Sequence, residues 1–599
     1  MNIKKLFKYE PKPNYDFNIQ STENASVQDL STDKIDQKVY SSFKKNLEFA
    51  QSKYNSLINS DIVIRHFSII CKNKQYKAFL LYIDGMTDSV IVNQFVLHPL
   101  MLRNKNNTFE DSTNTQNIQN IQKTQKTETT QNTQNIQKSQ YTQNIQKSQN
   151  TKKVQNAQNN KNDTQKKYED LSNYIYERLI PNNNISIQKQ FDKIISDINS
   201  GNCALFVDTL NVVFDIDAKG FKQRSIDRPQ IENVIKGPQE AFVENIRTNT
   251  SLLRRLTNNE NLVIENVEVG EISKTKCALC YMQNIANGDL IAEAKYRLNN
   301  LSIDTLVSSG ELEQLIQDGS SFGIPQVLST ERPDKCVKAV MQGRAVILVN
   351  GNPYALIIPS VMTDFLASPE DSNLNPLFAN FLKFIRLLAF IITLLLPGMY
   401  IAVTNFHQEL FPTELLFSIL VARENVPFPI IFELLLMEIS FELIREGGLR
   451  TPSAIGSTLG IVGALILGDA AVAANIVSPI LIIVVAITGL SSFVIPNFSF
   501  GFHLRVFRFA FTILGYIAGF LGIGLGIYVY MVLLCSIKSF GVAYLSPISP
   551  NISGLSLKYF VPPFWKQEYR NDFLAPKKQV SQSKFSMVWK KENSNGKNQ

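Results

Sequence analysis

Three glutamates lie in a stretch of sequence that is otherwise apolar and long enough to cross a membrane. Residues 429–450 read PIIFELLLMEISFELIREGGLR, and the three carboxylates are Glu433, Glu438 and Glu442. Each carboxylate near a bilayer centre costs roughly 2.5–3.5 kcal/mol on insertion scales, so three of them would not face lipid. We therefore expect them to face protein, water or an ion, as part of a permeation or coupling element.

The spacing of these charges divides them between two faces of the predicted helix. Glu438, Glu442 and Arg445 follow an i, i+4, i+7 pattern and share one face, whereas Glu433 lies on another. On that shared face Arg445 is placed to neutralise Glu442. Two interpretations stay open at this point. The charges form buried ion pairs between helices, or some of them line a cation path.

The next apolar segment is rich in glycine and begins with polar residues. Gly456 and Gly460 are spaced for close helix packing, and the strand and lysine of a nucleotide-binding loop are missing around them. The same segment offers a polar mouth and an apolar throat, which is what a dewetting gate needs. Its pore candidates are Ser457, Thr458, Ile461, Val462 and Leu465. An ordinary packed helix would use the same residues.

The elements that must position these groups are helices of a membrane domain. Residues 384–545 are strongly apolar and predict an all-α domain with about four spans and one re-entrant or interfacial segment. We expect long helices at 386–404, 429–444, 476–495 and 506–537, with the short segment at 411–421.

The residues before the membrane domain predict an α/β region made of two small subdomains. Strands and helices alternate there, and Asn350-Gly351 marks one hairpin turn. The tract 104–167 is dominated by Asn, Gln, Lys and Thr and lacks the apolar area needed to order it. The predicted boundaries are 1–35 for a disordered N-terminus, 36–200 for a first subdomain interrupted by the disordered insertion 104–167, 201–380 for the second subdomain, and 551–599 for a basic tail.

Several function classes find no support in the sequence. The net charge of +8 is small and spread along 599 residues, which argues against nucleic acid as a partner. Cys277 and Cys280 form one CxxC without a second pair, and His407-x-Glu409 is a weak metal pattern. We predict no enzyme activity, no metal and no cofactor. The N-terminus lacks the apolar core of a signal peptide, so the N-terminal region is expected in the cytoplasm, as is the basic tail.

A group of polar residues in the second subdomain has the character of helix caps and interdomain hydrogen bonds. The signature residues are Glu244, Asn245, Arg247, Asn249, Arg254, Glu331, Arg332 and Asp334.

These residues belong to ordered blocks that resemble the A-subunit family of spore germinant receptors, the GerA family. The resemblance extends from about Asp61 to Pro550 outside the insertion. Its blocks include GPQEAFVENIRTNTSLLRR (237–255), STERPD (329–334), GRAVILVNGNP (343–353), SPED (368–371), LPGMYIAVTNFHQELFPTELL (396–416), ARENVPFP (422–429), MEISFELIREGG (437–448), GSTLGIVGALILGDAAV (456–472) and SFGVAYLSPISP (539–550).

The resemblance implies a subunit embedded in the inner membrane of a bacterial spore, with its N-terminal domain and C-terminal tail in the cytoplasm. It implies partnership with a transporter-like B subunit and a lipoprotein C subunit, and assembly of several copies around a path for monovalent cations. Alternatives are a scaffold subunit without a pore and a paralogue of the stage V sporulation AF type. A stand-alone secondary transporter is a further alternative, but it would show two matched broken helices, and only the region near Pro427 is broken.

Overall fold

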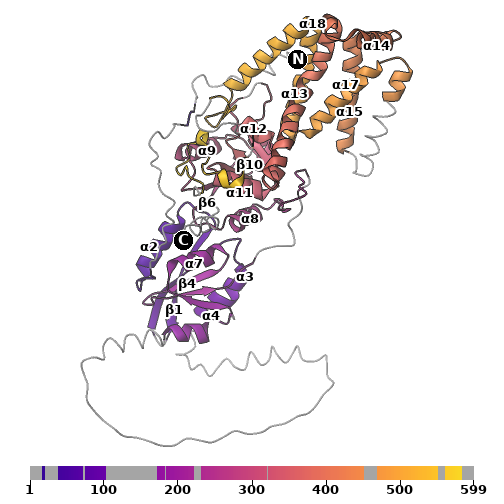
Figure 1. Cartoon of the computed structure of the whole chain (residues 1–599). Helices are drawn as coiled ribbons and strands as arrows, with labels where there is room; N and C mark the ends of the chain where they lie inside the picture. The colour runs from indigo at the N-terminus through magenta and orange to yellow at the C-terminus, as the bar shows by residue number, and fades with distance from the viewer. Residues whose placement is uncertain are drawn as a thin grey trace, which may run out of the picture. The chain divides into compact units, whose positions relative to one another are not determined.

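The computed structural model describes residues 17–19, 38–71, 74–102, 171–182, 184–220, 229, 231–319, 322–450, 468–550, 560 and 562–582 (Figure 1). The chain divides into two compact units. One contains residues 34–57 and 61–221, and we call it the first subdomain. The other contains residues 1–33, 58–60 and 222–599, and it combines the second subdomain with the membrane helices.

The first subdomain is a five-stranded antiparallel sheet with helices packed on it. Its strand order is β1-β2-β4-β5-β3. The β-branched and aromatic residues of the β1–β2 hairpin favour strands, and its ladder pairs Ile62 with Ile83 and Cys71 with Lys74. The elements are α2 (Phe43–Tyr54), β1 (Ile62–Cys71), β2 (Lys74–Ile83), α3 (Ser89–Ile91), η1 (Val92–Leu97), α4 (His98–Leu102), η3 (Ile175–Leu179), β3 (Ile185–Gln188), α7 (Phe191–Asn199), β4 (Cys203–Val207) and β5 (Val213–Ile216).

The second subdomain repeats this plan. Its antiparallel sheet has the order β6-β7-β9-β10-β8, which is the same order when its five strands are counted along the chain. The predicted hairpin turn is confirmed, since β9 pairs with β10 and Gly351 adopts φ +86° between them. The elements are α8 (Ile246–Thr257), β6 (Leu262–Val269), β7 (Thr275–Met282), α9 (Gly288–Asn299), α10 (Ser309–Ile316), β8 (Leu328–Thr330), α11 (Pro333–Met341), β9 (Ala345–Val349) and β10 (Ala355–Ile358).

The boundary predicted between residues 200 and 201 is wrong. Strands β4 and β5 pair with β2 and β3, so they complete the first sheet, and the division between the units falls between Phe221 and Lys222. The two subdomains do contain both helices and strands, as predicted. Among the described strands of both subdomains, every ladder is antiparallel. The described strands therefore include no pair of parallel neighbours joined by a crossover helix.

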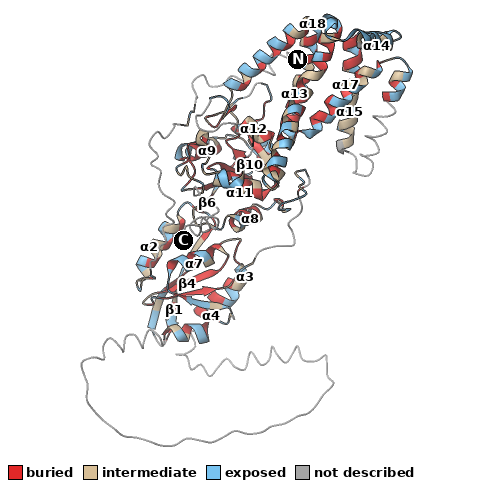
Figure 2. Ribbon diagram, viewed as in Figure 1, coloured by how far each residue is buried: buried red, intermediate tan, exposed pale blue. Residues whose placement is uncertain are grey.

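The C-terminal part is helical. Two of the described helices are long and apolar enough to cross a membrane, namely α13 and α18, and α17 is apolar but shorter. The elements that follow β10 are α12 (Met362–Phe365), η4 (Pro369–Ser372), α13 (Pro376–Phe406), η5 (Gln408–Leu410), α14 (Thr413–Arg423), α15 (Ile430–Arg450), α17 (Pro479–Val494), α18 (Phe498–Ser536), β11 (Lys538–Ser539) and β12 (Val542–Ala543). Many large apolar side chains of these helices are exposed, as a lipid environment requires, and Figure 2 colours the exposed positions pale blue.

Helix α18 does not run straight. Gly519 has φ +60° and ψ −139°, and the two arms on either side of it fold against each other. His503 on the first arm lies 3.2 Å from the hydroxyl of Tyr530 on the second. A straight helix of 39 residues would be about 58 Å long, roughly twice the hydrocarbon core. The expectation of one tilted span at 506–537 is therefore wrong, because the glycine allows a turn.

Part of the predicted basic tail is ordered. Residues 562–582 carry η6 (Phe564–Lys566) and η7 (Asp572–Leu574) and form a strap on the second subdomain. Leu574 is fully buried with Val361 and Val542, and Arg570 Nε donates to the carbonyl of Met341 at 2.7 Å. The buried leucine and the satisfied guanidinium explain why this segment is not a free tail.

Candidate functional site

The acidic helix α15 presents its charges to α18. Glu438 is 1% exposed, and its Oε2 lies 3.1 Å from Nε of Arg508. Glu442 lies 3.3 Å from Nη2 of Arg508 and 3.6 Å from Nε of Arg505. Arg445 approaches Glu442 at 3.3 Å from one turn along the same helix. The predicted shared face is thus present, and we call these five residues the α15–α18 charge cluster.

The arginines of α18 were not predicted as partners of these glutamates. Arg505 and Arg508 are spaced i, i+3 in the apolar run FHLRVFRF, and that spacing is the signal that could have identified them. Both glutamates of the cluster therefore face guanidiniums from α18. A carboxylate already paired in this way is less open to a cation than a free one.

Hydrogen bonding within the charge cluster is incomplete. Nε of Arg505 and Arg508 and both carboxylate oxygens of Glu438 are buried without a hydrogen bond of good geometry among the described residues. Donor and acceptor atoms that lack a hydrogen bond of good geometry therefore lie next to each other. The cluster therefore attracts its members by charge while leaving hydrogen-bonding capacity for a small polar molecule or a rearranged contact.

Glu433 lies apart from the cluster, as predicted, and joins three helices. It is fully buried, and its carboxylate accepts hydrogen bonds from the amide of Ser478 at 3.1 Å and from Nη2 of Arg423 at 3.2 Å. Ser478 caps the N-terminus of α17, where the helix dipole favours a negative charge. Glu433 thereby fastens α14 and α17 to α15.

The remaining pore candidates cannot be placed. Residues 451–467 lie outside the described part of the chain, and they include all five pore candidates, which are Ser457, Thr458, Ile461, Val462 and Leu465.

The signature residues of the second subdomain act on the backbone around α8, as caps and hydrogen bonds. Asn245 caps the helix by accepting from the amides of Arg247 and Thr248. Asn249 is fully buried and bonds both the amide and the carbonyl of Val243, at 2.8 and 2.6 Å. Glu244 contributes its carbonyl, which accepts from the amide of Gly351. Arg254, 2% exposed, donates to the side chain of Asn59 at 3.0 Å.

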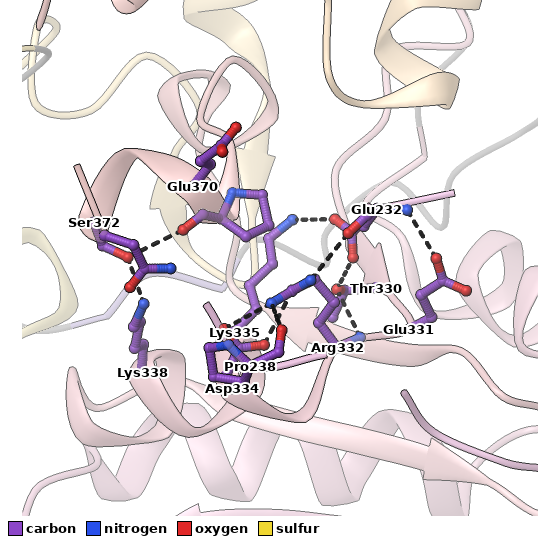
Figure 3. A network of polar contacts seen from close by, with 12 residues as sticks. Glu232, Pro238, Thr330, Glu331, Arg332, Asp334, Lys335, Lys338, Glu370 and Ser372 are labelled. Carbon is purple, nitrogen blue, oxygen red and sulfur yellow. Dashed lines mark hydrogen bonds and ion pairs between the residues drawn. The ribbon is translucent and has the colours of Figure 1, made fainter. Parts of the chain in front are cut away.

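The other signature residues form the network drawn in Figure 3. Arg332 has no exposed surface, pairs with Asp334 at 3.1 Å, and donates to the carbonyls of Glu232 and Pro238 at 3.0 and 2.7 Å. Glu331 accepts from the amides of Ile231 and Glu232 at 2.6 and 2.8 Å. These bonds hold residues 231–238 in place, and loss of the Arg332 guanidinium would leave buried groups unpaired at a cost of about 3–5 kcal/mol.

A buried ion pair fixes the root of α13. Both carboxylate oxygens of Asp371 lie near Nη1 of Arg386, at 2.8 and 2.6 Å, and the two residues are 5% and 8% exposed. Asp371 closes the turn η4 by accepting from the amide of Ser368. The pair joins the soluble part of the chain to its first membrane-length helix.

The cysteine pair Cys277-x-x-Cys280 lies within strand β7. Three positions along a strand place the two side chains on opposite faces of the sheet, and each thiol packs in a different apolar core. Burial raises the pKa of the Cys277 thiol to about 12. These thiols therefore pack as small apolar groups and are not placed to share a metal.

Comparison with family models and with known proteins identifies relatives of this chain. Residues 48–146 and 136–573 match the family described as Bacillus/Clostridium GerA spore germination protein. Spore germination protein KA of Bacillus subtilis (strain 168) is 39% identical over 411 residues, covering 68% of this chain and 76% of that protein. Spore germination protein A1 of the same organism is 41% identical over 355 residues, covering 59% and 74%.

One solved structure is also similar. It is the crystal structure of the N-terminal domain of the A subunit of the Bacillus megaterium spore germinant receptor GerK3, with 26% identity, 54% of this chain and 98% of that chain covered, and a TM-score of 0.34. The family match spans most of the chain from the first subdomain to the strap. The chain belongs to the GerA family of spore germination proteins.

Proposed function

We propose that this chain is the A subunit of a spore germinant receptor, a ligand-responsive complex in the inner membrane of the spore. Several copies would surround a path that releases monovalent cations, together with a transporter-like B subunit and a lipoprotein C subunit. Family membership supports the receptor role. The charge cluster between α15 and α18 is the observation that supports a functional role for the membrane helices. Charged side chains are rare in apolar helices and are usually functional there.

Within this proposal the α15–α18 charge cluster holds helices together rather than lining the cation path. Arg508 is 1% exposed and Glu438 is 1% exposed, so the pair is screened from the surface. Glu442 also faces three guanidiniums, so its carboxylate is already paired within the cluster. The path is then assigned to the segment with Ser457, Thr458, Ile461, Val462 and Leu465, whose apolar residues suit a dewetting gate.

The test measures potassium release from spores that carry variants of the chain. Val462→Ala and Leu465→Ala shorten apolar side chains at the proposed throat, so we expect altered release rates at normal membrane abundance. Unchanged release in both variants would contradict the throat. Helix α14 offers a matched control, Val421→Ala, because Val421 is 68% exposed and is not one of the proposed throat residues.

The charge cluster has a test of its own. Arg508→Gln leaves the buried carboxylate of Glu438 without its partner, and Glu438→Gln removes one of the two carboxylates that face Arg508, so both should lower the amount of assembled complex. The exchange Glu438→Arg with Arg508→Glu should restore assembly in part. A cation-lining role predicts the opposite pattern for Glu438→Gln, with normal assembly and changed ion release.

A scaffold subunit without a pore is the second candidate. The paired state of the cluster favours it, because both of its carboxylates already face guanidiniums. Cross-linking in native membranes distinguishes the two candidates. A ring of copies supports the channel, whereas one copy for each complex supports the scaffold.

A further inference from the structure

The segment that precedes α8 in the second subdomain depends on side chains for its position. Residues 231–240 form neither helix nor strand. Their amides at Ile231 and Glu232 donate to Glu331, and their carbonyls at Glu232 and Pro238 accept from Arg332. Lys335 adds an ion pair to the Glu232 carboxylate at 2.7 Å (Figure 3). We call residues 231–240 the entry segment.

The entry segment also touches the turn that precedes α13. The carbonyl of Lys236 accepts from Nδ2 of Asn373 at 3.0 Å. The next residue, Gly237, has φ +144°, and a Cβ there would lie 2.5 Å from the same Nδ2 atom. Backbone and side chain are therefore in direct contact, and neither can move toward the other.

Asn373 follows Asp371 by two residues, and Asp371 forms the buried ion pair with Arg386 on α13. The intervening residue, Ser372, accepts a hydrogen bond from Lys338 of α11. The turn η4 is closed by a reciprocal capping box between Ser368 and Asp371, so it moves as one piece. A short series of contacts thus runs from the entry segment through η4 to the first membrane-length helix.

We propose that Asp371 and Arg386 are positioning residues that set the root of α13 according to the position of the entry segment. A displacement of the entry segment would reach α13 through Gly237, Asn373 and the buried ion pair. Packed contacts of this kind transmit small shifts because interiors are dense and resist compression. For its consequence on ion release, this inference rests on the proposed function.

The first test measures amide hydrogen exchange of the purified full chain in detergent micelles. Arg386→Gln removes the charge that Asp371 faces, although it does not touch the entry segment. We expect exchange of the 231–242 peptide to rise by about fivefold, because coupled elements loosen together. Faster exchange confined to residues around Asp371 and Arg386 would overturn the proposal.

Coupling between two elements acts in both directions, so a second measurement loosens the entry segment and follows exchange in α13. Arg332→Lys loosens the entry segment at its other end, since lysine cannot reach both carbonyls and Asp334 with the same fork. We expect faster exchange in the first turns of α13. Lys295→Gln is the matched control for both variants, because Lys295 pairs with Glu265 at 2.6 Å away from the entry segment and α13. It should leave both peptides unchanged.

Potassium release from spores provides the functional arm. Arg386→Gln should change the germinant-triggered release rate by about fivefold at normal membrane abundance, and Lys295→Gln should not. Should the wild-type chain prove to have no part in ion release, the proposed function fails while the exchange measurements still decide the coupling. Normal exchange and normal release in Arg386→Gln would sink the positioning role itself.

Discussion

Two buried asparagines make the same pair of hydrogen bonds in the two subdomains. Asn46 bonds the amide and carbonyl of Tyr40 at 3.0 and 2.6 Å, and Asn249 does so with Val243 at 2.8 and 2.6 Å. In both cases the partner lies six residues earlier, at the turn into a helix of 12 residues. Each side chain replaces backbone partners that the turn itself lacks.

Replacing Asn249 with alanine should destabilise the second subdomain. The amide and carbonyl of Val243 would lose their partners, at a cost of about 1–3 kcal/mol. Thermal unfolding of the purified chain in detergent should show a lower midpoint. Asn300→Ala is the control, because Asn300 is exposed and its loss leaves no buried group unpaired. Equal midpoints for the two variants would contradict the role of Asn249.

Asp215 gives the first subdomain a dependence on pH. Burial raises the pKa of its carboxyl to about 6, although Asn202 and Ser186 donate hydrogen bonds to it. A pKa that is higher in the folded state means that folding binds a proton. Stability is therefore greatest below the unfolded value and falls as pH rises from about 4 through about 6.

Asp215→Asn should remove this dependence and raise stability at neutral pH by about 2 kcal/mol. Denaturant unfolding at pH 4.5 and 7.5, values chosen on either side of the shifted pKa of about 6, measures the difference. Asp192→Asn provides a comparison, since Asp192 lies exposed at the first turn of α7. A wild-type stability that rises between the two pH values would reverse the assigned sign.

At the scale of elements, glycines decide how α13 meets α18. The backbones approach so closely that a Cβ at Gly515 would lie 2.5 Å from the carbonyl oxygen of Gly398. Phe390 stacks on Phe500 near one end, and Phe406 lies against Gly519 near the other. The first arm of α18 therefore runs parallel to α13, and the second arm returns.

Gly515→Ala should force these helices apart and lower the amount of folded protein in membranes. Small residues permit close packing between membrane helices, and a methyl group has no room at this contact. Gly524→Ala is a matched control on the second arm, because a Cβ there meets nothing within 4 Å. Detergent-extracted yield and thermal midpoint compare the two. If both variants behave alike, the close approach is not important for stability.

Sequence patterns predicted the strands well and the long helix poorly, for physical reasons. The hairpin β9–β10 consists of two short apolar runs on either side of an Asn-Gly turn, and both signals are local. Gly519 belongs to a series of glycines whose spacing equally describes a packed straight helix, and only its φ of +60° reveals the turn. Spacing on α15 identified the shared face of Glu438 and Glu442, but their partners on α18 lie more than 60 residues away, as with Glu442 and Arg508.

At the scale of the whole molecule, the strap formed by residues 562–582 packs on the second subdomain, far from it in the sequence. Asn287 donates to the carbonyl of Ala575, and Lys577 donates its amide to Ile285. Leu574 fills an apolar site beside Val361. The sequence predicted a basic tail here but not its contacts, because the anchors are single residues without a periodic pattern.

Truncation separates the strap from the residues beyond it. A chain ending at residue 582 keeps Leu574 and Arg570 in place, so we expect wild-type stability. A chain ending at residue 561 uncovers the site beside Val361 and should lose about 2–4 kcal/mol, as for deletion of a buried leucine. Differential scanning fluorimetry of the full membrane protein measures both. Equal melting of the two truncations would show that the strap is dispensable.

The repeated strand order has a consequence for the history of the chain. One plan of five strands, used twice in succession, is what a doubled gene would leave behind, and the shared asparagine bonds agree with that origin. In the second copy the last strand, β10, is followed by α12, η4 and α13. That copy therefore contains the whole route from its sheet to a membrane-length helix, and an ancestor with that copy alone would already have possessed it.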